Sequence, residues 1–282
     1  MINKTIFNEK KESELRNSHK EPEIRYSYVP RNRWNVLDLL TLFGTKAISS
    51  HIFYDINMKW VQDCQDKFSN QGEKITPTAF LLKAISLAQK NHPVARTFSL
   101  PFGRTVTYND IVAGFTVERE VKGKPVVFFG EIEDPVQKSL LQIRDELKDY
   151  AEKEIYEVPK LKQQMVFVKM PWSVRQMILL FGQWFPSLRL ICMKATFGLS
   201  SLGALGVKLV CGPSVCTSVF GVGKIEDRVI VENGALVVRP MMSLALCFDQ
   251  RIMDAGVAAQ FMQEVKKLLE GGLESFVNEL KE

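Results

Sequence analysis

Histidine and cysteine, which bind zinc and act as bases and nucleophiles, are both scarce in this chain. The three histidines, His19, His51 and His92, form no ligand cluster along the sequence, and Cys211 and Cys216 lack the spacing of zinc ligands. The five cysteines are an odd number in a long chain, which favours reduced thiols in a cytoplasmic protein over a disulfide framework. The sequence therefore predicts no metal site.

A polar segment that follows an apolar run is the second candidate for chemistry. Asp249-Gln250-Arg251-Ile252-Met253-Asp254 comes directly after Met241–Phe248, which has the composition of a buried strand. Gln250 carries an amide, which donates and accepts hydrogen bonds but cannot take up a proton near neutral pH. Asp254 is suited to cap a following helix. Ser200, further upstream, could be a strand side chain that backbone groups satisfy. Residue type alone is therefore also consistent with purely structural roles for Asp254 and Ser200.

The elements that must position these residues are helices and strands, whose sequence patterns alternate along the chain. Apolar residues recur every three or four positions in five segments, which predicts helices at 36–46, 76–91, 134–153, 171–185 and after Asp254. Alternating or continuous apolar runs predict strands at 49–57, 111–117, 126–130 and 241–248, and a hairpin over 229–238 that turns at Asn233-Gly234. This order favours a layered α/β or α+β domain.

Two segments do not fit the layered pattern. Residues 1–28 are polar and highly charged, which predicts a flexible tail and not a signal peptide or membrane anchor. Residues 158–169 are predicted to be a basic connection that leads into the apolar helix 171–185. That helix is too short and too interrupted by polar residues to span a bilayer. We expect it to be buried against the core or a neighbouring subunit, with a protein or membrane-surface contact as the alternative.

The overall charge argues against one class of partner. The chain has 46% hydrophobic residues, enough for a sizeable core, and a formal net charge of +5. Acidic residues are spread among the basic ones, so nucleic-acid binding is not predicted. A modest basic excess is also compatible with an anionic ligand such as a phosphorylated cofactor.

Several motifs together resemble the catalytic domain of the 2-oxo-acid dehydrogenase complexes, the dihydrolipoamide acyltransferases, which are related to chloramphenicol acetyltransferase. Asp249–Ala255 occupies the place of their Asp-His-Arg-x-x-Asp-Gly signature, and Phe197–Gly206 resembles their active-site serine strand. The likeness runs from about Val29 to the C-terminus and is interrupted by an insertion at 160–189. The other matching segments are a strand–hairpin–strand (220–226 and 238–246), an entry segment (29–33) and a helix start (138–141).

The resemblance implies both a fold and a reaction. The fold over residues 29–282 would be a two-layer α/β sandwich, with a mixed sheet flanked by helices, as in chloramphenicol acetyltransferase. The reaction would be acyl transfer between a thioester and a thiol, with coenzyme A or acyl-coenzyme A as substrate, at a site between the subunits of a homotrimer. By position, Ser200 would donate a hydrogen bond to the oxyanion, and Asp254 would pair with Arg33 to fix the loop.

The chain departs from the family at the base. Gln250 stands where the family has the histidine that removes the thiol proton, and losing a general base costs about 10²–10⁴-fold in rate. Ala255 replaces the glycine of the signature. His51 lies within the likeness and is the leading candidate for a substitute base. A thiol with a pKa of about 8.5 is already partly ionised at pH 7, so slow transfer is compatible with these changes.

Two functions are therefore open. The first is a stand-alone, coenzyme-A-linked acyltransferase with an altered base at Gln250. The second is a non-catalytic, trimeric binding or scaffold protein that retains the fold. No lipoyl segment or subunit-binding module is recognised ahead of residue 29, so we expect no lipoyl group on this chain and no swinging-arm role.

Overall fold

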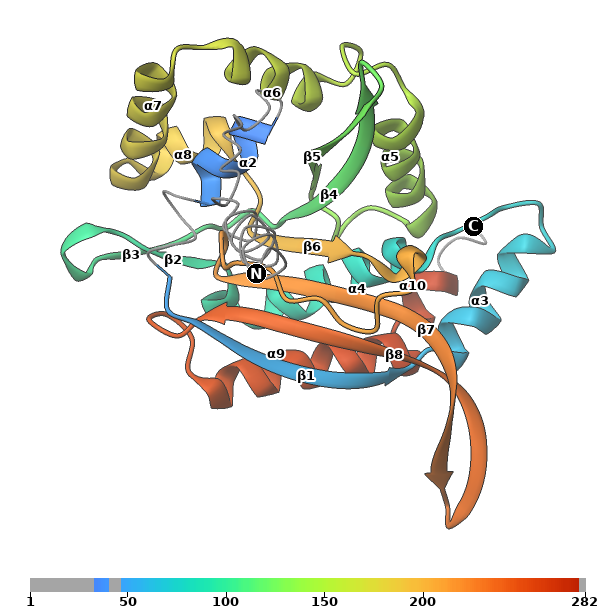
Figure 1. Cartoon of the computed structure of the whole chain (residues 1–282). Helices are drawn as coiled ribbons and strands as arrows, with labels where there is room; N and C mark the ends of the chain where they lie inside the picture. Colours follow the sequence, from blue (N-terminus) through green and yellow to red (C-terminus); the bar gives the residue numbers. More distant parts are fainter. Residues whose placement is uncertain (1–32, 41–46, 279–282) are drawn as a thin grey trace, which may run out of the picture. The chain divides into compact units, whose positions relative to one another are not determined.

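A mixed six-stranded sheet forms the centre of the structure, which is a computed structural model that describes residues 33–40 and 47–278 (Figure 1). The spatial order of its strands is β1-β8-β7-β6-β4-β5. β6 runs parallel to both of its neighbours, and the other neighbouring strands are antiparallel. The strands are β1 (Ser49–Asn57), β4 (Val112–Val121), β5 (Lys124–Glu133), β6 (Phe197–Ser201), β7 (Ser218–Glu232) and β8 (Ala235–Asp249); β2 (Thr97–Ser99) and β3 (Thr105–Thr107) form a separate ribbon.

Helices pack against this sheet to form the main core. Buried residues of α3, α4, α5 and α9 contact the apolar side chains that alternate along the sheet strands, such as Phe220 and Leu246. The described residues belong to one compact unit, Arg31–Glu282. The helices are α2 (Trp34–Leu39), α3 (Lys59–Ser69), α4 (Pro77–Asn91), α5 (Leu140–Glu152), α6 (Pro159–Lys169), α7 (Trp172–Trp184), α8 (Pro186–Cys192), α9 (Ala255–Lys267) and α10 (Glu274–Asn278).

The central helix α4 starts where the sequence predicts it. Pro77 occupies its first turn, where a missing N–H costs nothing, and residues 79–89 are buried. Lys83 is among them, and only 3% of this residue is exposed. Its ammonium donates hydrogen bonds to the carbonyl oxygens of Pro135, Val136 and Lys138 at 3.2, 2.6 and 2.8 Å. A buried amine thus holds the turn between β5 and α5.

Several elements differ from the sequence prediction. α5 begins at Leu140 and not near Asp134, because Ser139 and Gln142 form a capping box and Asp134 has a positive φ of 47°. Residues 159–169, predicted as a connection, form α6. The helix α3 was not predicted.

Near the middle of β7, a loop lies flat on the sheet because glycines leave room for it. A Cβ added to Gly221 would lie 1.8 Å from the carbonyl oxygen of Val210, and one added to Gly223 would lie 1.8 Å from that of Lys208. The backbone N–H of Lys224 donates to the carbonyl oxygen of Val207 at 2.8 Å. Residues 207–212, which we call the covering loop, are therefore held against the sheet by close backbone contact.

The outer edge of β5 is covered by α6. The Gln164 side-chain amide accepts a hydrogen bond from the Phe129 backbone N–H at 3.0 Å and donates one to the Phe129 carbonyl oxygen at 2.7 Å. Leu161 of the same helix packs on Val126 and Phe128 in a small apolar cluster. An amide side chain thus takes the place that a neighbouring strand would occupy.

The apolar helix α7 is only partly buried within one chain, and its burial against a neighbouring subunit, which the sequence also allowed, stays a prediction. It buries Arg175, Leu179 and Gly182, and Arg175 forms an ion pair with the buried Asp38 at 2.6 Å. Its exposed large apolar side chains are Trp172, Val174, Met177, Leu180, Phe181 and Trp184. Among the described residues, no helix is both long and apolar enough to cross a bilayer. Contact of residues 171–185 with another protein or a membrane surface stays a prediction.

Candidate functional site

The polar segment after β8 forms a tight turn that is locked by an ion pair. The buried carboxylate of Asp249 accepts hydrogen bonds from the Arg251 guanidinium, the shortest at 2.6 Å, and from the Arg251 backbone N–H at 3.1 Å. Hydrogen bonding to Asp249 raises the pKa of Arg251, so the guanidinium stays a cation. The residue between the two, Gln250, is thereby presented at the end of the strand.

Gln250 is fixed to the neighbouring strand by both its backbone and its side chain. Its backbone N–H donates to the carbonyl oxygen of Ile48 at 2.9 Å, and its side-chain Oε1 accepts a hydrogen bond from the Ser50 hydroxyl at 2.9 Å. With the amide oxygen engaged in this way, the Nε2 group is the side of Gln250 that remains for a ligand, and it is a donor. The geometry gives this position no group that could accept a thiol proton.

Ser200 lies on β6, two strands away from β8. Its hydroxyl accepts a hydrogen bond from the Thr116 hydroxyl at 3.4 Å. In the sheet register, Ser200 pairs with Gly221, which pairs with Ala245. Gln250 lies five residues beyond Ala245, so strand geometry separates it from Ser200 by roughly 16 Å along the strands and roughly 10 Å across them. Within one chain, the two side chains cannot act on the same acyl group.

Asp254 and Arg33 are both exposed and lie at helix starts. Asp254 is the N-cap residue of α9 and has the extended backbone of a cap, but its side chain forms no capping hydrogen bond. Arg33 precedes α2. Within the described residues these two side chains form no ion pair with each other, so their predicted pairing is not made inside one chain and stays a prediction.

His51 lies beside two thiols. It is directly opposite Cys247 in the β1–β8 register, and one ligand atom each of His51, Cys211 and Cys247 lie within 4.8 Å of one another. The expectation that the histidines join no ligand cluster is therefore wrong for His51. The sequence could not show the cluster, because strand pairing and the covering loop bring together three distant parts of the chain. The role of His51 as a substitute base stays a prediction.

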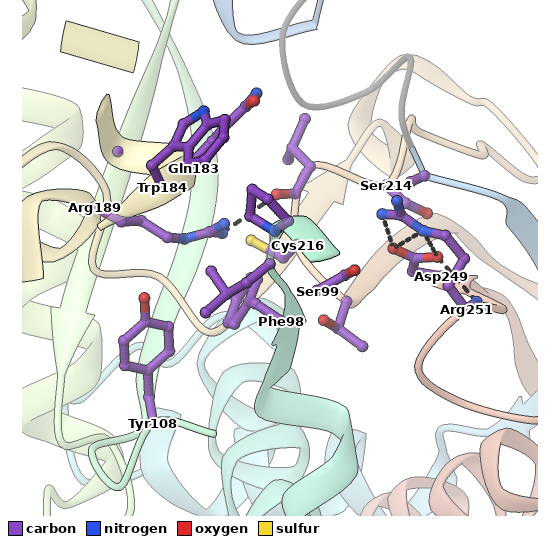
Figure 2. A pocket seen from close by; sticks show the side chains of 16 residues that line it. Phe98, Ser99, Tyr108, Gln183, Trp184, Arg189, Ser214, Cys216, Asp249 and Arg251 are labelled. Atoms are coloured by element: carbon purple, nitrogen blue, oxygen red, sulfur yellow. Dashed lines mark hydrogen bonds and ion pairs between the residues drawn. The ribbon is translucent and has the colours of Figure 1, made fainter. Parts of the chain in front are cut away.

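A cavity of about 340 Å³ lies next to the Asp249–Arg251 turn (Figure 2). Figure 2 shows Asp249 and Arg251 on one side of it and Arg189 of α8 on the other. Arg189 is buried, and its guanidinium lies 3.7 Å from the centre of the Phe98 ring. Burial lowers the pKa of Arg189, yet a guanidinium starts so high that it remains a cation. The cavity thus has a buried cation, Arg189, on one side and the Asp249–Arg251 ion pair on the other.

Sequence reasoning found Asp249 and Arg251 within a motif but missed other residues that line this cavity. Cys216, whose thiol pKa burial raises to about 11, lines it together with Tyr108, whose pKa burial also raises. Tyr108 follows β3, and Cys216 lies between the covering loop and β7, and neither segment carries a motif. The sequence offers one signal, the charged Arg189 close to the end of the apolar segment 171–185.

Residues 192–277 match the sequence profile of the 2-oxoacid dehydrogenases acyltransferase (catalytic domain). The lipoamide acyltransferase component of the branched-chain alpha-keto acid dehydrogenase complex of Pseudomonas putida is 44% identical over 79 residues, which are 27% of this chain and 18% of that protein. The dihydrolipoyllysine-residue acetyltransferase component of the pyruvate dehydrogenase complex of Staphylococcus epidermidis is 25% identical over 241 residues, 81% of this chain and 47% of that protein. The chain thus spans less than half the length of these relatives.

Solved structures agree on the fold. The cubic core of the pyruvate dehydrogenase multienzyme complex superposes with a TM-score of 0.68 at 22% identity, covering 91% of this chain and 95% of the other. A probable dihydrolipoamide acetyltransferase from Listeria monocytogenes gives a TM-score of 0.66 at 17% identity, covering 88% and 95%. The predicted fold class, a mixed sheet flanked by helices as in the chloramphenicol acetyltransferase-like proteins, is confirmed. In sequence over residues 192–277, and in fold over most of its length, the chain resembles the acyltransferase catalytic domain of the 2-oxoacid dehydrogenase complexes.

Proposed function

We propose that this chain is a coenzyme-A-linked acyltransferase that transfers an acyl group from a thioester to a thiol, without a general base at the usual position. The observation that carries the proposal is the combination of the matched segment 192–277 with a locked turn that presents Gln250 where the family has histidine.

The reaction would begin with an acceptor thiol that has already lost its proton to solvent. Its thiolate attacks the thioester carbonyl carbon, a new C–S bond forms, and the carbonyl oxygen becomes an oxyanion to which the Ser200 hydroxyl donates a hydrogen bond. When the oxyanion collapses, the original C–S bond breaks and coenzyme A leaves as a thiolate, which takes up a proton from water. Gln250 would contribute only hydrogen bonding, through its Nε2 group.

The site would be completed by a second copy of the chain. The separation of roughly 16 Å along and roughly 10 Å across the sheet keeps Ser200 and Gln250 of one chain apart. A relative in fold is described as the cubic core of a multienzyme complex, which supports assembly of several copies. A homotrimer, with Ser200 of one subunit facing Gln250 of the next, satisfies both observations. Native mass spectrometry at micromolar concentration tests this arrangement, and a strictly monomeric protein would contradict it.

The cavity beside Asp249 and Arg251 is the proposed place for the anionic part of a substrate. Arg189 lies on one side of it as a buried cation, and the Arg251 guanidinium, which is paired with Asp249, lies on the other. Arg189 would neutralise a phosphate or carboxylate group there, and Arg251 would add hydrogen bonding. A phosphorylated cofactor such as coenzyme A has such groups. Isothermal calorimetry with coenzyme A should give at least tenfold weaker binding for Arg251→Gln than for wild type.

The decisive experiment compares wild type with Gln250→His, using acetyl-coenzyme A and dihydrolipoamide. Gln250→His should raise the rate by about 10²–10⁴-fold, because a general base contributes that much. Gln260, which is exposed on α9, provides the matched control, since Gln260→His adds a histidine away from the turn and should leave the rate unchanged. Ser200→Ala should lower the rate of both wild type and Gln250→His.

The same assay distinguishes acyl transfer from the alternative function. The non-catalytic binding or scaffold hypothesis is favoured if wild type shows no turnover above buffer and Gln250→His gains none while still folding and assembling. Turnover that Ser200→Ala abolishes would count decisively against that alternative.

A further inference from the structure

We propose that His51, Cys211 and Cys247 form a binding site for a thiophilic metal ion, with Zn²⁺ as the expected occupant. The inference is independent of acyl transfer and rests on a cluster that the reaction above does not use.

The three side chains come from separate elements that share one face of the sheet. His51 on β1 and Cys247 on β8 are direct cross-strand partners, and side chains in that relation project from the same face about 5 Å apart. Cys247 pairs in turn with Val219 on β7. A Cβ added to Gly212 would lie 3.6 Å from a methyl group of Val219, which places the end of the covering loop, and Cys211 with it, over this row.

The row of cross-strand partners His51, Cys247 and Val219 is held in place by an apolar cluster and by the covering loop. Cys247 is fully buried and packs in an apolar cluster with Val219 and Phe98. The covering loop is held down at Gly221 and Gly223, and just beyond it the Ser49 hydroxyl donates a hydrogen bond to the Ser214 hydroxyl at 3.1 Å. One ligand is therefore fixed, while His51 and Cys211 are exposed and can rotate toward it.

The distances are close to those of a metal site. The three candidate ligand atoms lie within 4.8 Å of one another. Around one zinc ion, with bonds of about 2.0–2.3 Å, ligand atoms lie about 3.5–4 Å apart. A contraction of up to about 1 Å is thus sufficient, and rotation of the exposed His51 and Cys211 side chains can supply it.

The donor set selects the kind of ion. One imidazole nitrogen and two sulfurs suit Zn²⁺ or Cu⁺, and they do not suit the oxygen-preferring Mg²⁺ or Ca²⁺. The Gly212 backbone N–H donates a hydrogen bond to the Cys247 sulfur, which is the kind of outer contact that stabilises a metal-bound thiolate. Because a cysteine binds zinc as its thiolate, metal binding at this site would release protons from the thiols.

Three protein ligands leave one position open in a tetrahedral zinc site. The site would also occupy His51, because an imidazole nitrogen bound to zinc cannot accept a thiol proton. Metal binding and the role of His51 as a substitute base are therefore mutually exclusive.

The test uses the full chain, reduced and stripped of metal with a chelator that is then removed. Zn²⁺ is titrated in competition with a chromophoric chelator, and Co²⁺ is added separately as a spectroscopic probe. We expect one Zn²⁺ per chain and a thiolate-to-cobalt charge-transfer band. Cys211→Ser and His51→Ala change exposed residues and should still fold; each should weaken Zn²⁺ binding at least tenfold.

The matched control is Cys216→Ala, which removes a buried thiol from the same apolar cluster without removing a proposed ligand. It should bind Zn²⁺ as wild type does. The proposal is overturned if the reduced wild-type chain binds no stoichiometric Zn²⁺ or Co²⁺, or if Cys211→Ser binds zinc as tightly as wild type. Because neither readout measures turnover, failure here leaves the proposed acyl transfer untouched.

Discussion

Replacing Gly221 with alanine is expected to destabilise the protein through one identifiable contact. The new Cβ would lie 1.8 Å from the carbonyl oxygen of Val210, whereas real Cβ atoms keep at least 3.0 Å, so the covering loop must move by 1.2 Å or more. Overpacking of this kind costs about 1–3 kcal/mol. Losing the hydrogen bond from Lys224 to Val207 adds about 1 kcal/mol.

The net effect is smaller than the sum, because alanine also restricts the unfolded chain. That restriction stabilises by about 0.4–1 kcal/mol, so the free energy of unfolding should fall by about 2–3 kcal/mol. Equilibrium urea unfolding measures it, with both proteins at the same concentration because an oligomer's stability depends on concentration.

Gly198 provides the matched control on the neighbouring strand. A Cβ there would lie 3.6 Å from the nearest Val219 methyl group, which is ordinary contact, and alanine restricts the unfolded chain there too, so Gly198→Ala should leave the unfolding free energy unchanged or raise it by up to about 1 kcal/mol. If Gly221→Ala unfolds within that margin of Gly198→Ala, the close approach of the covering loop is refuted. Gly221→Ala should also weaken Zn²⁺ binding, since it displaces Cys211.

Three further predictions concern stability. Lys83→Met should lower the free energy of unfolding by about 1–3 kcal/mol in urea, because buried carbonyl oxygens lose their donor; an unchanged midpoint would contradict this. Ser139→Ala should cost about 1 kcal/mol by removing the capping box of α5, and a loss below about 0.3 kcal/mol would argue against that cap. Burial raises the thiol pKa of Cys216 from 9.0 to about 11, so its stabilising contribution is present below pH 9 and is lost as pH rises to 11. Over that range, in chelator-treated protein, wild type should lose about 2–3 kcal/mol more than Cys216→Ala; parallel pH profiles would show that the thiol is not desolvated.

The elements that the sequence predicted well have strong local signals. β1 was predicted at its observed bounds because its pattern alternates, and α4 because Pro77 opens a long apolar helix. The turn at Asn233-Gly234 has the positive φ values that those residue types allow, 51° and 81°. By contrast, α6 buries only Leu161 and Val168 along its length. Two buried positions among several lysines do not make a recognisable helical pattern of apolar residues, so α6 was not predicted.

The candidate site divides in the same way. Ser200 and Gln250 could be proposed from the sequence because each lies in a contiguous motif. The cluster of His51, Cys211 and Cys247 could not be found, since it depends on strand register and on a loop held by Gly221. Such contacts are set by tertiary packing, which leaves no period or spacing in the sequence.

The hydrogen bonds from Gln164 of α6 to the edge strand β5 have a consequence for solubility. The unpaired N–H and C=O groups of an edge strand can form hydrogen bonds with a strand of another molecule, and such pairing leads to aggregation. At Phe129 both groups are already taken by a side chain from α6. Residues 160–189 are therefore more than an addition to a complete sheet: trimming them away would open that rim to a strand from another molecule, and the shortened protein should precipitate where the full chain does not.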